Sequence, residues 1–214
     1  MMSFTGTGLT CLRSDRVVFQ NLNFSVAKNE VLYVKGPNGS GKSSLLRIMA
    51  GLLRPINGEL YWNGEKLSEI EDDFKGKLHY VGHQNPIKGA LSVRENLKFW
   101  ASIHGSEREN NSVVSALETF KLEKFADLPA RFLSAGQARR LNLARLNATP
   151  APLWILDEPH NSLDEGASLA LDENVVRHLD KGGMVVISTH DSISKEVKVL
   201  DLSDFALGQS RLEV

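Results

Sequence analysis

One glycine-rich segment of the chain carries residue types that bind phosphate groups. It matches the pattern G-x-x-x-x-G-K-[ST], in which glycines let backbone N–H groups approach phosphate oxygens closely. An apolar run, Val31–Gly36, leads into it and a helical pattern follows, as this motif requires. We expect Lys42 to face the β- and γ-phosphates and the Ser43 hydroxyl to bind Mg²⁺. The residues predicted to bind the nucleotide here are Gly36, Pro37, Asn38, Gly39, Ser40, Gly41, Lys42, Ser43 and Ser44.

Two adjacent carboxylates, Asp157 and Glu158, follow a second apolar run, "LWIL". Open α/β sheets place their ligands at this end of a strand, which favours a site over two solvated surface acids. We expect Asp157 to hold Mg²⁺, directly or through water, and Glu158 to polarise the attacking water. His190 follows a third apolar run, "VVIST". A lone histidine is more often structural, but this position favours a catalytic role.

A second helix start with small polar residues lies far along the chain, in "FLSAGQARRLNLARL" at positions 132–146. Such a start has unsatisfied backbone N–H groups and a hydroxyl, and it is suited to holding an anion. Because the chain already has one phosphate loop, this second start is useful only for a phosphate that reaches it from elsewhere.

The bulk composition narrows the possible classes of protein. The chain has 214 residues and a formal net charge of −1, so no general attraction to nucleic acid or anionic membrane is implied. Its single cysteine, Cys11, excludes an intrachain disulfide and fits a reducing compartment. The sequence shows no secretion signal and no apolar run near the ~20 residues of a membrane helix.

Strand and helix patterns alternate along most of the chain. Strands are predicted over 16–26, 31–36, 58–67, 78–84, 153–159, 184–189 and 197–202, and a helix lies between the fifth and sixth of these. This alternation predicts an α/β core with a mostly parallel sheet. Residues 92–146 have helical spacing throughout, with Ser92 and Ser112 as expected N-caps. We therefore predict one domain over 1–214, with a core of 1–91 and 147–214 and an inserted helical subdomain of 92–146.

Taken together, these motifs resemble the ATP-binding cassette (ABC) ATPases over essentially the whole chain. Beyond the phosphate loop and the acid pair, the matching positions are Gln84, the signature segment 133–137, the segment 162–164 and His190. The resemblance implies a P-loop core of parallel sheet, an N-terminal antiparallel β-subdomain and an inserted helical subdomain. It also implies that the protein hydrolyses ATP to ADP and phosphate.

Further site residues follow from the resemblance alone. Gln84 would bind Mg²⁺ together with Ser43 and Asp157, and would take part in catalysis with Lys42, Glu158 and His190. In this family two cassettes pair head to tail, so that the signature segment of one copy caps the γ-phosphate held by the other. The residues that would contact nucleotide in this way are Ser134, Gly136, Gln137 and Asp164.

The sequence departs from the family pattern at two positions. Ala135 replaces the usual glycine of the signature, and its methyl group is tolerable if the backbone there has φ < 0. Arg13 occupies the place where the family usually stacks an aromatic ring on adenine. A guanidinium plane can also stack on a base, so Arg13 or Arg16 is assigned there, although a solvated surface arginine is an equal alternative.

Within the family, the chain is most similar to the ATP-binding subunits of cytochrome c maturation (heme exporter) complexes. The resemblance implies membrane subunits and a second copy as partners, a peripheral position on the cytoplasmic face of the inner membrane, and no nucleic acid. Direct heme binding is not expected, because the sequence has no C-x-x-C-H motif. The alternatives are an ABC ATPase for a lipid, lipoprotein or nutrient, a soluble non-transport ABC ATPase, and a nucleotide sensor without hydrolysis. A groove beside the segment 87–104 is expected to receive a helix of the membrane subunit.

Overall fold

The computed structural model describes residues 2–103, 109–189 and 198–205, and for residues 109–111 it describes the backbone alone. Contacts between residues divide the chain into two compact units. The first unit comprises Met1–Tyr80, Pro152–Glu158 and His178–Val214, and the second comprises Val81–Ala151 and Pro159–Arg177.

The first unit begins with an antiparallel sheet of order β2-β1-β4-β5. Its strands are β1 (Ser3–Arg13), β2 (Arg16–Ala27), β4 (Asn57–Trp62) and β5 (Glu65–Lys66). The β4–β5 turn uses Asn63 and Gly64 with φ of 53° and 88°, as the Asn-Gly signal predicts. Gly6 is required in β1 because a Cβ there would collide with the ring of Phe24.

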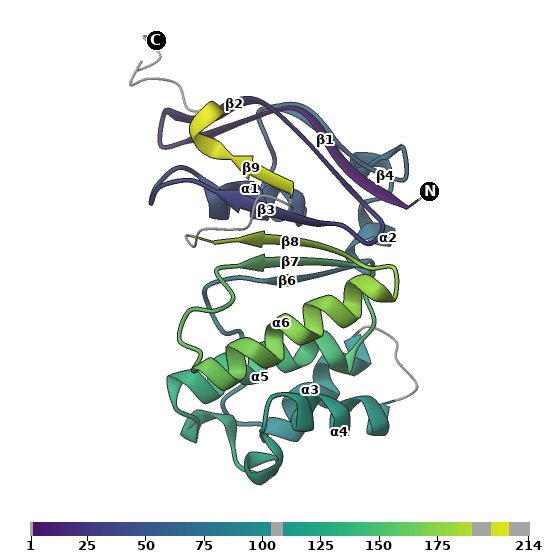
Figure 1. Ribbon diagram of the computed structural model, residues 1–214, viewed down its shortest axis with the longest axis vertical. Helices are drawn as coiled ribbons and strands as arrows, with labels where there is room; N and C mark the ends of the chain where they lie inside the picture. Colours follow the sequence, from purple (N-terminus) through teal and green to yellow (C-terminus); the bar gives the residue numbers. More distant parts are fainter. Residues whose placement is uncertain (1, 104–108, 190–197, 206–214) are drawn as a thin grey trace. The chain divides into compact units, whose positions relative to one another are not determined.

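The second sheet of this unit has the order β6-β7-β8-β3-β9, and Asp157 and Ser188 end two of its strands. Its strands are β3 (Val31–Lys35), β6 (Leu78–Val81), β7 (Leu153–Asp157), β8 (Met184–Ser188) and β9 (Lys198–Asp201). β7 and β8 are buried along their whole length, which explains their continuous apolar runs. The pairs β7–β8, β8–β3 and β3–β9 are parallel, and Figure 1 shows these strands stacked in one layer.

Helix α1 (Lys42–Met49) begins directly after the glycine-rich loop. Its apolar side chains, including Leu45 and Ile48, share one core with Phe4 of β1, Ile155 of β7 and Val186 of β8. The remaining short helices of this unit are η1 (Leu67–Glu69), α2 (Glu71–Lys75) and η4 (Leu202–Phe205). The loop between β3 and α1 is therefore anchored at both ends by buried elements.

The second unit is helical in the described part of the chain (Figure 1). Its elements are α3 (Val93–Ile103), α4 (Glu109–Thr119), η2 (Glu123–Phe125), η3 (Ala130–Phe132), α5 (Ala135–Ala148) and α6 (Glu165–Asp180). The last residues of α6, from His178, group with the first unit. Helix α5 contacts both α3 and α4, and its residues from Leu141 to Leu146 are all buried. This central place explains why the middle of α5 has no exposed face.

The predicted fold class is confirmed: an antiparallel sheet accompanies a parallel sheet with helices. The predicted cap at Ser92 is also confirmed, because its hydroxyl accepts a hydrogen bond from the Glu95 N–H (3.2 Å). The cap predicted at Ser112 is wrong, since α4 already starts at Glu109 and places this serine within the helix. The insertion boundaries 92–146 stay a prediction.

Candidate active site

The glycine-rich loop has backbone conformations that larger residues adopt with strain. Gly36, Gly39 and Gly41 have φ of 144°, 82° and 100°. A Cβ at Gly41 would also collide with Val18 of β2, so this position needs glycine for space as well as for conformation. The loop thus keeps its backbone N–H groups close to whatever occupies its concave side.

Lys42 is buried at the start of α1, with its side chain only 5 % exposed. Its Nζ donates hydrogen bonds to the backbone oxygens of Gly36 (2.9 Å) and Pro37 (3.3 Å). The same Nζ lies 4.0 Å from Oε1 of Glu158. A buried ammonium group needs such anionic or carbonyl partners, and a phosphate group would supply more of them.

The loop also holds a buried hydroxyl that suits an anionic ligand. Ser40 Oγ has no hydrogen-bond partner among the described residues. A buried hydroxyl without a partner is costly, and a phosphate oxygen would accept a hydrogen bond from it. The loop residues therefore fit a nucleotide phosphate.

The acid pair stands at the end of β7, and β8 supports it through Ser188. Ser188 Oγ donates to Oδ1 of the buried Asp157 (2.7 Å) and accepts from the Glu158 backbone N–H (2.9 Å). Glu158 has φ = 45°, a left-handed conformation that is uncommon outside glycine and is often found at functional sites. This conformation lets the side chains of Asp157 and Glu158 point in different directions. Glu158 is positioned beside Lys42, while Asp157 is held by β8.

Arg13 and Arg16 face each other across the turn of the β1–β2 hairpin, and both are exposed. Cys11, two residues earlier, is buried at 2 % exposure. Burial raises the pKa of the Cys11 thiol, and this effect outweighs the nearby Arg13 charge and a hydrogen bond with Ser44 of α1. The hairpin is thereby attached to the helix that follows the phosphate loop. The stacking of Arg13 on a base stays a prediction.

The signature segment forms a capped helix start in the second unit. Ser134 Oγ accepts from the Gln137 N–H (3.3 Å), and Gln137 Oε1 accepts from the Ser134 N–H (2.8 Å). A hydroxyl that accepts a hydrogen bond still has its own proton to donate. Ala135 is the first residue of α5 and has no positive φ, so the condition for tolerating its methyl group is met.

Helix α5 also positions the Gln84 segment, through side chains that the sequence analysis missed. Arg139 donates to the backbone oxygens of Gly82 (2.7 Å) and Pro159 (3.3 Å). Asn142 donates to Asn85 Oδ1 (3.0 Å), and its Nδ2 lies 3.5 Å from the backbone oxygen of Gln84. Their only sequence signal was the presence of polar residues inside an otherwise buried helix.

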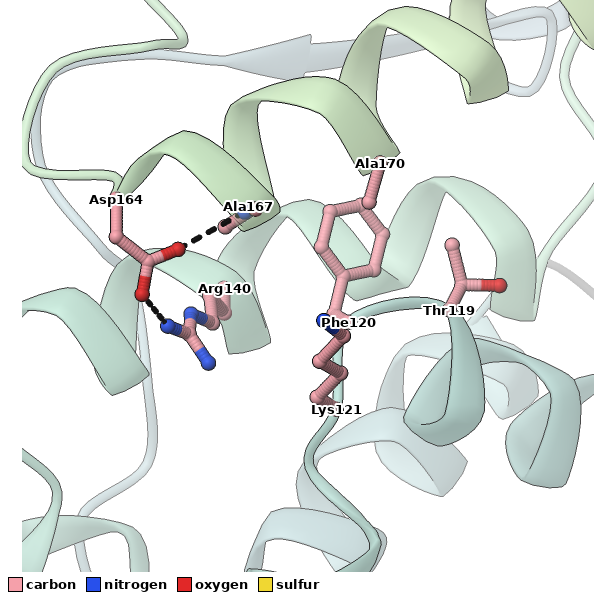
Figure 2. A pocket seen from close by; sticks show the side chains of 8 residues that line it. Thr119, Phe120, Lys121, Arg140, Asp164, Ala167 and Ala170 are labelled. Carbon is pink, nitrogen blue, oxygen red and sulfur yellow. Dashed lines mark hydrogen bonds and ion pairs between the residues drawn. The ribbon is translucent and has the colours of Figure 1, made fainter.

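Asp164 lies beside a small pocket in the second unit, with a volume of about 150 Å³. Figure 2 shows its carboxylate between the Ala167 N–H at the start of α6 (2.9 Å) and the Arg140 guanidinium of α5. The Ala167 N–H, followed by the Arg140 charge, holds the pKa of Asp164 below its usual range. Asp164 therefore joins α6 to the signature helix as an ionised carboxylate.

The structure brings together only part of the predicted site. The phosphate loop from Gly36 to Ser44, the acid pair and Arg13 belong to the first unit. The second unit contains the signature residues from Ser134 to Gln137, together with Gln84 and Asp164. His190 lies outside the described residues. The individual roles of these residues stay predictions.

Comparison with known proteins shows the family to which the chain belongs. The family profile described as ABC transporter matches residues 19–161. The cytochrome c biogenesis ATP-binding export protein CcmA of Paramagnetospirillum magneticum is 47% identical over 210 residues, which cover 97% of this chain and 97% of that protein.

Solved structures agree with this match. A putative ABC transporter ATP-binding protein from Pyrococcus furiosus has a TM-score of 0.83 at 26% identity, covering 96% of this chain and 100% of its own. The ATP-binding cassette MJ0796, in a dimeric post-hydrolysis state with ADP and Pi, has a TM-score of 0.76 at 26% identity. That alignment covers 88% of each chain.

The glycine loop, the buried lysine and the acid pair define a nucleoside triphosphatase of the P-loop class. More narrowly, the chain belongs to the ABC transporter family and is an ATP-binding, ATP-hydrolysing member of it. In the part of the chain that the structure describes, no helix is long and apolar enough to cross a membrane.

Proposed function

We propose that two copies of this chain pair head to tail and hydrolyse ATP to drive a membrane complex of cytochrome c maturation. The observation that carries the hydrolytic part is the approach of Lys42 Nζ to Glu158 Oε1, 4.0 Å, at the glycine loop. A buried lysine, an N–H-rich loop and a carboxylate at one strand end are the parts that phosphoryl transfer to water requires.

The proposed chemistry assigns each residue one task. The loop N–H groups and Lys42 hold the β- and γ-phosphates, and Glu158 polarises the water that attacks the γ-phosphate. Ser134 and Gly136 of the second copy cap the γ-phosphate from the opposite side with a hydroxyl and a helix N-terminus. His190 holds the γ-phosphate, and Gln84 and Gln137 complete the closed site.

A Mg²⁺ ion bound with the nucleotide would neutralise charge that develops on the phosphates, and its proposed ligands are Ser43, Asp157 and Gln84. Hydroxyl, carboxylate and amide oxygens are donors that suit this hard cation. Ser188 keeps the Asp157 carboxylate oriented through its 2.7 Å hydrogen bond. Asp157 is buried at the strand end, so its orientation depends on that neighbour.

The names of similar proteins support the proposed assignment of this ATPase to cytochrome c maturation. The similar proteins of Paramagnetospirillum magneticum and Rhodospirillum rubrum are both named as cytochrome c biogenesis ATP-binding export proteins, each 47% identical to this chain. Export requires a membrane pathway, so the proposed partners are integral membrane subunits. The chain would then lie peripherally on the cytoplasmic face of the inner membrane. The exported species, heme by this proposal, would be handled by those partners.

The substitution Glu158→Gln tests the catalytic part. It keeps the side-chain shape and removes the charge, so ATP should bind without turnover, with a rate loss of ~10²–10⁴-fold. Uncleaved ATP should then hold two copies together, giving a dimer in ATP and a monomer in ADP by analytical ultracentrifugation. Wild-type hydrolysis by this variant would contradict the role of Glu158, and a monomer in saturating ATP would contradict the paired site.

The membrane partner has its own test on α3. Phe99 and Trp100 are half-buried there, with Lys88 over the Phe99 ring (4.4 Å) and Arg145 over the Trp100 ring (4.6 Å). Ile103, at the end of the same helix, is 57% exposed. We expect Ile103→Asp to abolish co-purification with membrane subunits and to leave ATP binding unchanged.

The equally exposed Leu169 of α6 (60%) provides the matched control, Leu169→Asp. Retained co-purification of Ile103→Asp would place the docking surface elsewhere. Membrane subunits belonging to a lipid or nutrient system would contradict the cytochrome c assignment.

A further inference from the structure

Phe132 is the most exposed aromatic side chain among the described residues, at 61%. It ends the short helix η3, two residues before Ser134, the N-cap of α5. The guanidinium of Arg131 lies 4.9 Å from the centre of its ring. Exposing an aromatic ring to water is unfavourable, and well over half of the surface of Phe132 stays exposed beside this contact.

Strands β1 and β2, as the structure describes them, offer no exposed aromatic platform for a base at the chain's own nucleotide site. The aromatic residues of β1 and β2 are Phe4, Phe19 and Phe24, and all three are buried in the core. The hairpin turn nearest the phosphate loop presents the exposed guanidinium groups of Arg13 and Arg16 instead. These groups can cover one face of a base, and no aromatic residue of β1 or β2 is placed to cover its other face.

Phe132 lies two residues before Ser134, the start of the segment that faces the second copy in our proposed pairing. In the proposed pairing, Ser134 and Gly136 meet the γ-phosphate of a nucleotide whose base lies further out along the same molecule. The chain from Phe132 to Ser134 passes through an extended Leu133 (φ −70°, ψ 141°), so the ring is carried away from the phosphate-capping end of α5. The aromatic ring and the capping hydroxyl are thereby presented by one continuous segment.

We propose that Phe132 stacks on the adenine base of the ATP held by the phosphate loop of the second copy. The base is then enclosed between Phe132 of one copy and Arg13 of the other. This assignment rests on the proposed head-to-tail pairing and adds a residue that recognises the base. It makes the closed dimer sensitive to the base as well as to the triphosphate.

The test compares two ligands, ATP and ribose 5′-triphosphate, which lacks the base. Both are titrated into the Glu158→Gln protein, and dimer formation is followed by analytical ultracentrifugation. Base–aromatic stacking implies that Phe132→Ala raises the ATP concentration for half-dimerisation by about 5- to 100-fold. With ribose 5′-triphosphate, the midpoints with and without Phe132→Ala should agree within about twofold. Phe132→Trp should restore the ATP midpoint, because it restores a π-face.

The controls separate three outcomes. Leu169→Ala removes an equally exposed apolar side chain (60%) and should leave both midpoints unchanged. An equal shift with both ligands, or no shift with ATP, overturns the stacking role while the paired site stands. Failure of the Glu158→Gln protein to dimerise in saturating ATP contradicts the proposed function, and the assignment of Phe132 with it.

Discussion

At the scale of single residues, Ser188 links the two acids of the site. Its hydroxyl donates to Asp157 Oδ1 and accepts from the Glu158 N–H, and it is fully buried. Both partners lie at the end of β7, while Ser188 ends the neighbouring strand β8. One hydroxyl therefore holds the buried Asp157 carboxylate and the backbone N–H of Glu158, the residue in the left-handed conformation.

We predict that Ser188→Ala destabilises the protein by about 1–3 kcal/mol, because it leaves buried polar groups without their partner. The rate of ATP hydrolysis should fall by more than the loss of folded protein explains, since both acids lose their orientation. Urea unfolding and steady-state ATP hydrolysis measure the two effects. Ser188→Thr keeps the hydroxyl and should recover much of the rate. Full activity of Ser188→Ala would contradict the positioning role.

His178 gives the fold a dependence on pH. Its ring stacks on Trp154 with centroids 3.8 Å apart, and its Nε2 is buried. Burial lowers the pKa of His178, against the opposing effect of the Pro152 and Met184 backbone. A lowered pKa means that the unfolded chain binds the proton more readily. Stability should therefore be full above the unfolded pKa of about 6.5 and fall as the pH drops below it.

We expect His178→Phe to remove this loss of stability between pH of about 7.5 and 5.5, because phenylalanine retains a ring and cannot titrate. Urea midpoints at several pH values measure the effect. Leu169→Ala, at an exposed residue of the same helix that cannot titrate, should keep the wild-type slope. An unchanged slope in His178→Phe would mean that another group causes the acid sensitivity.

At the scale of elements, α5 has two separable tasks at its first turn. Ser134 caps the helix through Gln137, and by our proposal it also faces a phosphate of the second copy. An aspartate is as good an N-cap as serine, but its charge repels phosphate. The two tasks can therefore be separated by a single substitution.

We predict that Ser134→Asp keeps the urea midpoint of the wild type and abolishes the ATP dimer of the Glu158→Gln protein. Ser134→Ala should lose ~1 kcal/mol of stability through the missing cap. These two variants serve as each other's control. An ATP dimer that persists in Ser134→Asp would show that the hydroxyl does not face a phosphate.

The elements best predicted from sequence were those with an unbroken signal. β7 and β8 read as apolar runs because they are buried on both faces, and the phosphate loop has a fixed spacing. β1 was not singled out as a strand, since Gly6 and Gly8 interrupt its alternation. The structure shows that Gly6 is needed for the approach of Phe24. The start of α4 was placed too late because its first turn, Glu109–Ser112, itself contains residues that are common N-caps.

The supporting residues of the site were harder to predict than its motifs. Ser188 and Arg139 act through hydrogen bonds to residues that are 30 or more and 20 or more positions away, respectively. Such contacts depend on which strands and loops become neighbours, and no local pattern encodes that. The motif residues, by contrast, stand in fixed sequence order around one loop or one strand end.

At the scale of the whole molecule, one chain carries one phosphate loop and one signature helix start. By our proposal, a working site takes the loop from one copy and the helix start from another. A head-to-tail pair then contains two such sites. Variants with opposite defects can distinguish this arrangement from a site formed within one copy.

The most direct measurement mixes two inactive proteins, Lys42→Ala and Ser134→Arg, and follows ATP hydrolysis. Each protein alone has two defective sites per pair. A mixed pair has one intact site, made from Lys42 of one copy and Ser134 of the other. We predict recovery to about one quarter of the wild-type rate, since half of randomly formed pairs are mixed and each mixed pair has one intact site of two. A mixture no more active than its separate components would contradict the shared site.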